Sequence, residues 1–263
     1  MNSVSLSSGL KLNTAVDGAA GNPWIILSNS LGANLSMWDP QMDLLTTKYR
    51  VLRYDTRGHG GSDAPAGPYS FTDLVGDVIA LMDAHEIENA AFMGLSMGGM
   101  TGLGLALHHA DRVSRVVCAD GRADAPDPFR AMWDQRMAAV EENGLAGIVD
   151  GTLASWLTAD WHAANPDDLA KIRSMVLGND PAGYIACCLA LKDLDYLRHL
   201  GGVKIPILYV GGSEDKGASP ETMGAMAAAT PGGTYLEVPN AAHVANINRP
   251  EAFNQAISDF LGL

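Results

Sequence analysis

The sequence predicts an α/β fold, with a mostly parallel central sheet, helices on both of its faces and a helical cap inserted between two of its strands. Two observations carry this prediction. Short, solid apolar runs, typical of strands buried on both faces, alternate with segments of helical periodicity. The alternation stops once, between residues 123 and 196, where helical patterns follow one another without a strand-like run.

The expected strands are short and mostly apolar. Residues 4–6 and 10–16 alternate weakly around Ser8-Gly9, which indicates a hairpin. Core strands are expected at 24–28, 51–54, 90–93, 113–119, 205–210 and 234–238. Parallel strands need long crossover connections, so the helical segments between these runs are expected to cover both faces of the sheet.

The expected helices have apolar residues that recur with a period near 3.6. The segment 71–85 also opens with Ser70 as N-cap and Asp73 three positions later, the pattern of a capping box. Further core helices are expected at 37–47, 98–109, 220–229 and 250–261. Helices of the insertion are expected at 131–142, 145–157, 167–177 and 184–191.

These elements divide the chain into a core and a cap. We expect residues 1–122 and 197–263 to form one α/β core, and residues 123–196 to form a helical cap within the same catalytic unit. In open α/β sheets, ligands bind outside the carboxyl ends of the strands. The cap is therefore expected to lie over that edge of the sheet.

Composition excludes several classes of partner. The net charge is −13 and the isoelectric point is near 4.7, which argues against nucleic acid and anionic membranes. The three cysteines form neither a disulfide framework nor a zinc pattern, and are expected to be buried apolar side chains in a reducing cytoplasm. We find no signal peptide and no membrane-spanning run, and expect a cytoplasmic monomer or small homo-oligomer.

The stretch FMGLSMGGM places Ser96 between an apolar strand and a small-residue helix. Gly94 and Gly98 complete the pattern G-x-S-x-G, which in this context predicts a nucleophile elbow. Side chains at these two positions would collide with the neighbouring strand and helix. The elbow holds the serine hydroxyl above the sheet at a helix N-terminus, where the partial positive charge favours a developing anion.

A serine hydroxyl needs a base, and His243 is the candidate among seven histidines. It lies between the last expected strand and the last helix, where a base reaches back over the elbow. The acid is expected just past strand 205–210, in GSEDKGASP. Asp215 is preferred by its position in the turn; Glu214 and Asp120, the latter at the end of strand 113–119, remain alternatives.

An acyl-transfer site also needs donors for the oxyanion. One is the backbone N–H after the nucleophile, that of Met97. The other comes from the loop after strand 24–28, where the N–H of Leu31 is the natural donor.

Together these residues resemble the α/β-hydrolase superfamily over the whole chain, and within it the 3-oxoadipate enol-lactonases. In that family Asn-Ser replaces the usual His-Gly of the oxyanion loop, as at Asn29-Ser30 here. The resemblance implies a cofactor-free hydrolase of a small cyclic ester with Ser96, Asp215 and His243 as its triad. It is carried by LSNSLGANLSMWDPQ (27–41), VLRYDTRGHGGSDAPAGPYSF (51–71), GLSMGGMTG (94–102) and GYIACCLALKDLD (183–195).

The sequence departs from this family where the substrate is expected to bind. From Ala119 at the end of strand 113–119 the chain reads Ala-Asp-Gly-Arg in place of Asn-Thr-Ala. The acid turn lacks the usual His before Asp, and the final loop has Ala-Ala-His-Val-Ala-Asn in place of a version that contains serine. The fold and the chemistry therefore carry over better than the substrate. A general carboxylesterase, a cofactor-free perhydrolase and a non-catalytic ligand receptor remain alternative interpretations.

A substrate carboxylate would need a cation in this acidic chain. Arg122 is the candidate, with Arg130 and Arg136 as alternatives; a surface salt bridge from Arg122 to Asp120 or Asp124 is the competing interpretation. Three tryptophans are expected to line the cap side of the pocket, with core packing as an equally good explanation for most of them: Trp133, Trp156 and Trp161. We expect a small ester or lactone as the partner and no metal.

Overall fold

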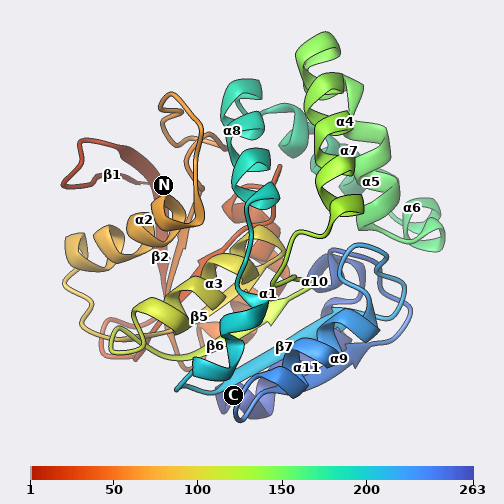
Figure 1. The fold of residues 1–263 in the computed structure, drawn as a ribbon. Coiled ribbons are helices and arrows are strands. Elements are labelled where there is room, and N and C mark those ends of the chain that lie inside the picture. Colours follow the sequence, from red (N-terminus) through yellow and green to blue (C-terminus); the bar gives the residue numbers. More distant parts are fainter. Residues whose placement is uncertain (1) are drawn as a thin grey trace.

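An eight-stranded sheet forms the centre of the computed structural model, which describes residues 2–263 (Figure 1). Its strands are β1 (Asn2–Ser5), β2 (Lys11–Asp17), β3 (Trp24–Ser28), β4 (Arg50–Tyr54), β5 (Ala90–Leu95), β6 (Val113–Ala119), β7 (Ile207–Gly212) and β8 (Thr234–Val238). They lie in the order β1-β2-β4-β3-β5-β6-β7-β8. The pairs β1–β2 and β2–β4 are antiparallel and the other five are parallel, as the sequence predicted.

Each face of the sheet has its own apolar cluster. Successive strand residues point to opposite faces, so Ile25 and Leu27 belong to one cluster and Ile26 to the other. The first face packs on α11 through Phe253, and the second packs on α2 through Val78. The core helices are α1 (Asp39–Leu45), α2 (Phe71–Ala84), α3 (Met97–His108), α9 (Pro220–Ala229), α10 (Ala245–Asn248) and α11 (Pro250–Leu261).

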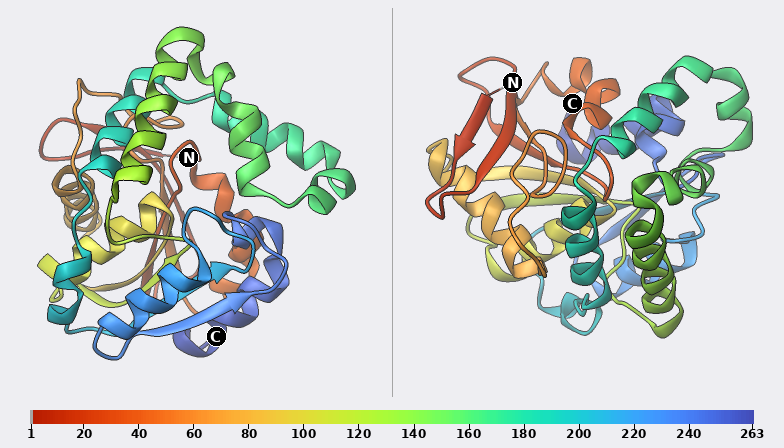
Figure 2. Two further views of the ribbon diagram at one scale, coloured as in Figure 1. Left: turned by 45° about the vertical axis from the view of Figure 1, so that its right-hand side comes forward. Right: turned by 90° about the horizontal axis from the view of Figure 1, so that it is seen from above.

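The chain between β6 and β7 is helical. An isolated bridge between Asp124 and Asp195 joins the two ends of this segment. Its helices stand together beyond one edge of the sheet in all three ribbon views (Figures 1 and 2). They are α4 (Asp127–Asn143), η2 (Gly144–Gly147), α5 (Val149–Trp156), α6 (Ala159–Ala164), α7 (Pro166–Leu177) and α8 (Pro181–Lys192). The last helix of the segment, η3 (Leu197–Gly202), instead contacts α3 and α9 of the core.

Several predicted boundaries differ from the structure for local reasons. The strand expected at 205–210 begins two residues later as β7, because Pro206 has no N–H to donate to a ladder. The helix expected at 184–191 begins at Pro181, where the Asp180 side chain caps it by accepting the Gly183 N–H at 2.8 Å.

Other helices were predicted in outline only. The helix expected at 37–47 is a short 3₁₀ helix, η1 (Leu35–Trp38), followed by α1. The pattern at 145–157 is likewise split into η2 and α5, and the short helices α6 and α10 were not predicted. Helices of four to six residues contain too few turns to give a periodic pattern. The capping box of α2 is confirmed, since Ser70 and Asp73 exchange both of its hydrogen bonds.

Two further observations concern the chain as a whole. Within residues 2–263, no helix has both the length and the apolar character that a membrane crossing demands. Cys118, Cys187 and Cys188 are buried and carry free thiols.

Candidate active site

The turn between β5 and α3 forces Ser96 into an unusual backbone conformation. Its φ is +55° and its ψ is −117°, a region that a non-glycine residue rarely occupies. A Cβ atom on Gly94 would lie 2.1 Å from the carbonyl oxygen of Gly98, and one on Gly98 would lie 2.2 Å from the carbonyl oxygen of Ser28. Both collisions were predicted, and they explain why glycine stands at these two positions.

Three loops from distant parts of the chain bring Ser96, His243 and Asp215 into one hydrogen-bonded chain. The Ser96 Oγ lies 3.0 Å from Nε2 of His243, and Nδ1 of His243 lies 2.8 Å from Oδ2 of Asp215. The other carboxylate oxygen of Asp215 accepts the N–H groups of Gly217 and Ala218 at 2.7 and 3.2 Å. This is the order of contacts that a serine nucleophile, a base and an orienting acid require.

The environment favours the ionised form of the acid and the protonated form of the base. Burial lowers the pKa of His243, but the charge of Asp215 and its hydrogen bond outweigh burial and raise that pKa to about 8. Burial raises the pKa of Asp215, while His243 and the two backbone donors bring it below its ordinary value. The pair is therefore suited to stabilising an imidazolium after proton transfer from serine.

The two alternative candidates for the acid, Asp120 and Glu214, do not hydrogen-bond to the His243 ring. Asp120 is fully buried with φ +44°, and its two oxygens accept the N–H groups of Gly212 at 2.8 Å and Ala245 at 3.3 Å. It thus joins the end of β6 to the end of β7 and to the start of α10. Burial and the nearby Asp215 raise the pKa of Asp120. Glu214 is exposed.

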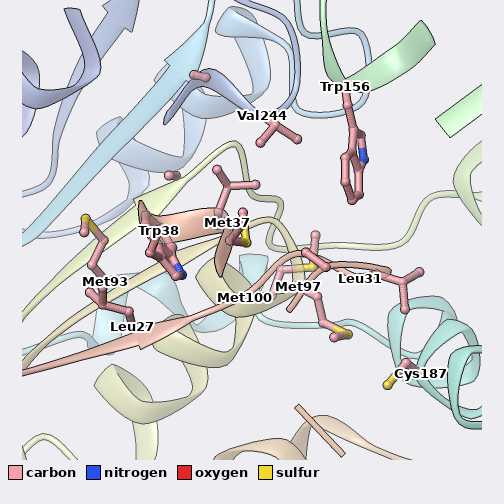
Figure 3. Close-up of a cluster of buried hydrophobic side chains, with 14 of the residues drawn as sticks. Leu27, Leu31, Met37, Trp38, Met93, Met97, Met100, Trp156, Cys187 and Val244 are labelled. Carbon is pink, nitrogen blue, oxygen red and sulfur yellow. The ribbon is translucent and has the colours of Figure 1, made fainter. Parts of the chain in front are cut away.

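The loop after β3 and the start of α3 bring the two predicted oxyanion donors beside Ser96. The N–H of Met97 is in the first turn of α3, where backbone N–H groups have no partner within the helix. Leu31 lines the same cavity as Ser96, and the Gly98 N–H donates to the Asn29 carbonyl at 3.1 Å, which ties the two segments together. Figure 3 shows Leu31 and Met97 in one cluster of buried side chains.

A cavity of about 480 Å³ opens above Ser96, between the sheet edge and the helices that follow β6. Trp133 and Trp156 both line it, as predicted. Trp156 extends from α5 toward the core side chains (Figure 3). Trp161 was also expected there, but it packs in the main apolar cluster with its ring near that of His162.

The two arginines that line this cavity differ in their contacts. Arg122 donates to the Gly217 carbonyl at 2.9 Å and to Asp124 at 3.1 Å, and its guanidinium stacks over Phe129. The salt bridge with Asp124 was the competing interpretation of this residue. Arg122 therefore braces the loop that carries Asp215.

Arg136 in α4 also lines the cavity. Its Nε donates to the Tyr184 hydroxyl at 2.5 Å and one terminal nitrogen donates to Thr152. Its guanidinium lies 5.8 Å from the ring centre of Trp133, whose Nε1 is buried and has no hydrogen-bond partner within the described chain. The third predicted arginine, Arg130, is exposed and donates to the Ala125 carbonyl at 2.7 Å.

Comparison with known protein families shows which family has this architecture. Residues 23–250 match the family model of the alpha/beta hydrolase fold. The chain belongs to the α/β-hydrolase family. One similar protein extends over nearly all of this hydrolase. A 3-oxoadipate enol-lactonase 2 of Acinetobacter baylyi is 38% identical over 94% of this chain and 91% of its own length.

Solved structures agree with this assignment. The crystal structure of the enol-lactonase from Burkholderia xenovorans superimposes with a TM-score of 0.96 over the whole of both chains, at 41% identity. A thermophilic esterase from Thermogutta terrifontis superimposes with a TM-score of 0.91 at 25% identity, over 99% of this hydrolase and 97% of the esterase. The protein is thus an enol-lactonase-like α/β hydrolase and an ester hydrolase.

Sequence analysis missed two residues that contact this site. His59 accepts the N–H of Gly32, beside Leu31, at 2.9 Å. Asn179 at the end of α7 donates to the carbonyl of the same glycine at 2.8 Å. The segment RGHGG around His59 contributed only to the family resemblance, and nothing in it indicates where the imidazole points. No sequence signal identifies Asn179.

Proposed function

We propose that this hydrolase opens a small lactone or enol-lactone through an acyl-enzyme, with Ser96 as nucleophile, His243 as base and Asp215 as the orienting acid. The observation that carries this proposal is the hydrogen-bonded chain from Ser96 Oγ through the His243 ring to Asp215, at 3.0 and 2.8 Å. It lies at the floor of a cavity large enough for a small cyclic ester.

In the first step Ser96 Oγ attacks the ring carbonyl while His243 Nε2 takes the hydroxyl proton. The N–H groups of Leu31 and Met97 receive the oxyanion. Such donors act where charge develops, and losing one costs about 2.7–4 kcal/mol of transition-state stabilisation. The strained backbone of Ser96 accompanies a position in which its hydroxyl lies 3.0 Å from Nε2 of His243.

Collapse of the tetrahedral intermediate breaks the ring C–O bond. The proton on His243 passes to the leaving oxygen, which in an enol-lactone becomes an enol and then a ketone. The leaving group stays attached to the acyl chain, so the acyl-enzyme holds the whole opened substrate. Water that His243 deprotonates then attacks the acyl carbon and releases the carboxylic acid.

We further propose that residues 123–196 act as a cap that supplies the substrate contacts. Arg136 is the cation for a substrate carboxylate, in place of Arg122, because Arg122 is fully committed to Asp124 and Gly217. The Trp133 ring lines the cavity beside Arg136.

Enol-lactonase names on relatives of 38% and 41% identity support a lactone as the substrate. The similarity to an esterase at 25% identity supports a second candidate, a carboxylesterase acting on an open-chain ester. Both reactions use the same residues in the same roles.

A cytoplasmic location fits the three buried free thiols.

A substrate panel separates these candidates. Purified protein is offered an enol-lactone bearing a carboxylate, the same lactone as its methyl ester, p-nitrophenyl acetate, and acetate with hydrogen peroxide. The lactonase proposal requires the highest kcat/KM on the carboxylate-bearing lactone. A preference for the open-chain ester would favour the carboxylesterase, and turnover confined to acetate with peroxide would overturn both. Ser96→Ala is the blank for every substrate.

A further inference from the structure

Hydrogen bonds fix the turn that follows β3, which consists of residues 30–33. The Ser30 carbonyl accepts the Ala33 N–H at 3.1 Å. The Gly32 N–H donates to Nε2 of His59 at 2.9 Å, and the Gly32 carbonyl accepts from Nδ2 of Asn179 at 2.8 Å. Gly32 has φ +85°, which is the value of the third residue in a type II turn.

This turn sets the direction of the Leu31 N–H. In a trans peptide the carbonyl and the following N–H point in opposite directions, so the Ser30 carbonyl and the Leu31 N–H diverge. Ala33 draws that carbonyl into the turn, and the Leu31 N–H therefore points out of it. Ser30 and Leu31 both line the cavity that contains Ser96.

His59 holds the turn only as a neutral ring with one tautomer. The Gly32 N–H is a donor, so Nε2 must be the unprotonated nitrogen. Nδ1 then carries the proton and donates to the Arg57 carbonyl at 3.2 Å. Protonation of Nε2 would place two donors against each other at a buried position.

The surroundings of His59 keep it neutral. The residue is 1% exposed, and the Tyr184 ring of α8 packs at a centre-to-centre distance of 6.3 Å. Burial lowers the pKa of His59, although the Arg57 carbonyl and the carboxylates of Asp55 and Asp180 act in the opposite direction. These two carboxylates are the charged groups that face the ring from its own loop and from the start of α8.

Asn179 joins the same turn to the helices above the sheet. Its Nδ2 donates to the Gly32 carbonyl and to the Met175 and Val176 carbonyls of α7, the latter two both at 3.0 Å. Its Oδ1 accepts the Gly60 N–H at 2.9 Å, one residue from His59. A single buried side chain thus connects the end of α7, the loop of His59 and the turn beside Ser96.

We propose that His59 and Asn179 are positioning residues for the oxyanion hole: together they hold the Leu31–Gly32 turn, and they do so only while His59 is neutral and α7 is in place. This inference rests on the proposed function of Leu31 as a donor. Without the imidazole, the Gly32 N–H would be buried and unpaired. Rotation of the Leu31–Gly32 peptide would relieve that cost and loosen the donor.

The test compares His59→Ala and His59→Gln with His85→Ala, the control. The glutamine oxygen can accept the Gly32 N–H, whereas alanine cannot. His85 is also partly buried, but it lies near Trp24 at the opposite end of β3. On the best ester or lactone, we expect His59→Ala to lower kcat about 10- to 100-fold with little change in KM, because misplaced catalytic groups cost rates of this order.

His59→Gln is expected to recover most of this loss, and Asn179→Ala to lower kcat in the same way as His59→Ala. Unfolding temperatures of all variants identify those that fail to fold. The proposal is overturned if His59→Ala matches the His85→Ala control, if glutamine is no better than alanine, or if KM alone changes. At acidic pH, wild-type kcat/KM should show a second downward step that His59→Gln lacks, and its presence in both would also overturn the proposal.

A further measurement keeps this inference separate from the proposed function. In ¹⁵N NMR spectra of the wild-type protein, His59 is expected to be the Nδ1–H tautomer at neutral pH, with Nε2 accepting the Gly32 amide. An Nε2–H tautomer would overturn the inference even if the enzyme is active. Absence of any turnover in the substrate panel would overturn the proposed function while the tautomer still reports on the turn.

Discussion

The Ser96 hydroxyl oxygen lies 3.0 Å from Nε2 of His243, although 147 positions separate the two residues in the chain. Ser96 reaches this point on the turn after β5, and His243 on the loop between β8 and α10. The carboxyl ends of parallel strands meet at one edge of the sheet, so these loops converge there. Predictions about the site follow from this contact and from the groups around it.

The first prediction concerns pH. Burial and Asp215 together leave the pKa of His243 at about 8. Only the neutral imidazole takes the Ser96 proton, so kcat/KM should rise with pH, with a midpoint near 8, and level off above it. The measurement is a kcat/KM profile from about pH 5 to 9.5 on an uncharged ester. A profile that is flat from pH 6 to 9 would contradict the assignment of His243 as the base.

The choice of Asp215 as the acid predicts a large effect for Asp215→Asn. The amide neither fixes the tautomer of His243 nor stabilises its charged form, so kcat should fall on the order of 10⁴-fold. The acidic limb of the pH profile should also move to lower pH, because the carboxylate no longer raises the pKa of His243. Retention of more than a tenth of wild-type kcat would show that another carboxylate takes this role.

Asp120 is the matched control for that variant. Asp120→Asn should keep kcat within about tenfold of wild type, because asparagine retains an acceptor for the Gly212 N–H and tolerates the left-handed backbone. Asp120→Ala should cost about 1–3 kcal/mol of unfolding free energy, since it leaves two buried N–H groups unpaired. Urea denaturation measures this cost. Loss of activity in Asp120→Asn equal to that in Asp215→Asn would reverse the two roles.

The contacts of the two arginines predict different kinetic effects. Arg136→Met should raise KM about 10- to 100-fold for a carboxylate-bearing lactone, the equivalent of a lost charged hydrogen bond. KM for its methyl ester should change much less. Arg122→Met should affect both substrates alike, since Arg122 braces the loop of Asp215. If the carboxylate-specific effect follows Arg122 instead, the assignment of Arg136 is wrong.

The cramped elbow predicts that Gly98→Ala is not tolerated. The added methyl group would lie 2.2 Å from the Ser28 carbonyl oxygen, so β3 and α3 must separate. Overpacking of this kind typically costs about 1–3 kcal/mol. Gly76→Ala on α2 is the control, because open space surrounds its Cβ position. Equal unfolding midpoints for the two variants in urea would contradict this account of the glycines.

Features with a local sequence signal were predicted well. The elbow around Ser96, the capping box at Ser70 and the mostly parallel sheet each depend on residues close together in the chain. Strand ends were less accurate where a proline such as Pro206 delayed pairing. Position within the turn after the core strand also favoured Asp215 over Glu214. In the structure Asp215 is buried against His243, whereas Glu214 is exposed.

Features that depend on contacts between distant segments were not predictable. Arg122 and Arg136 look alike in the sequence, and only the structure distinguishes the one paired with Asp124 from the one beside Trp133. The convergence of His59 and Asn179 on Gly32 likewise joins three segments that share no local pattern.

The most direct test of the central claim is covalent labelling of the nucleophile. The purified protein is treated with a fluorophosphonate, digested, and mapped by mass spectrometry, with the His243→Ala variant treated in parallel. We predict one adduct per chain, on the peptide that contains Ser96, formed much more slowly in the variant. A label on another residue, or an equal rate in the absence of the His243 imidazole, would contradict the account.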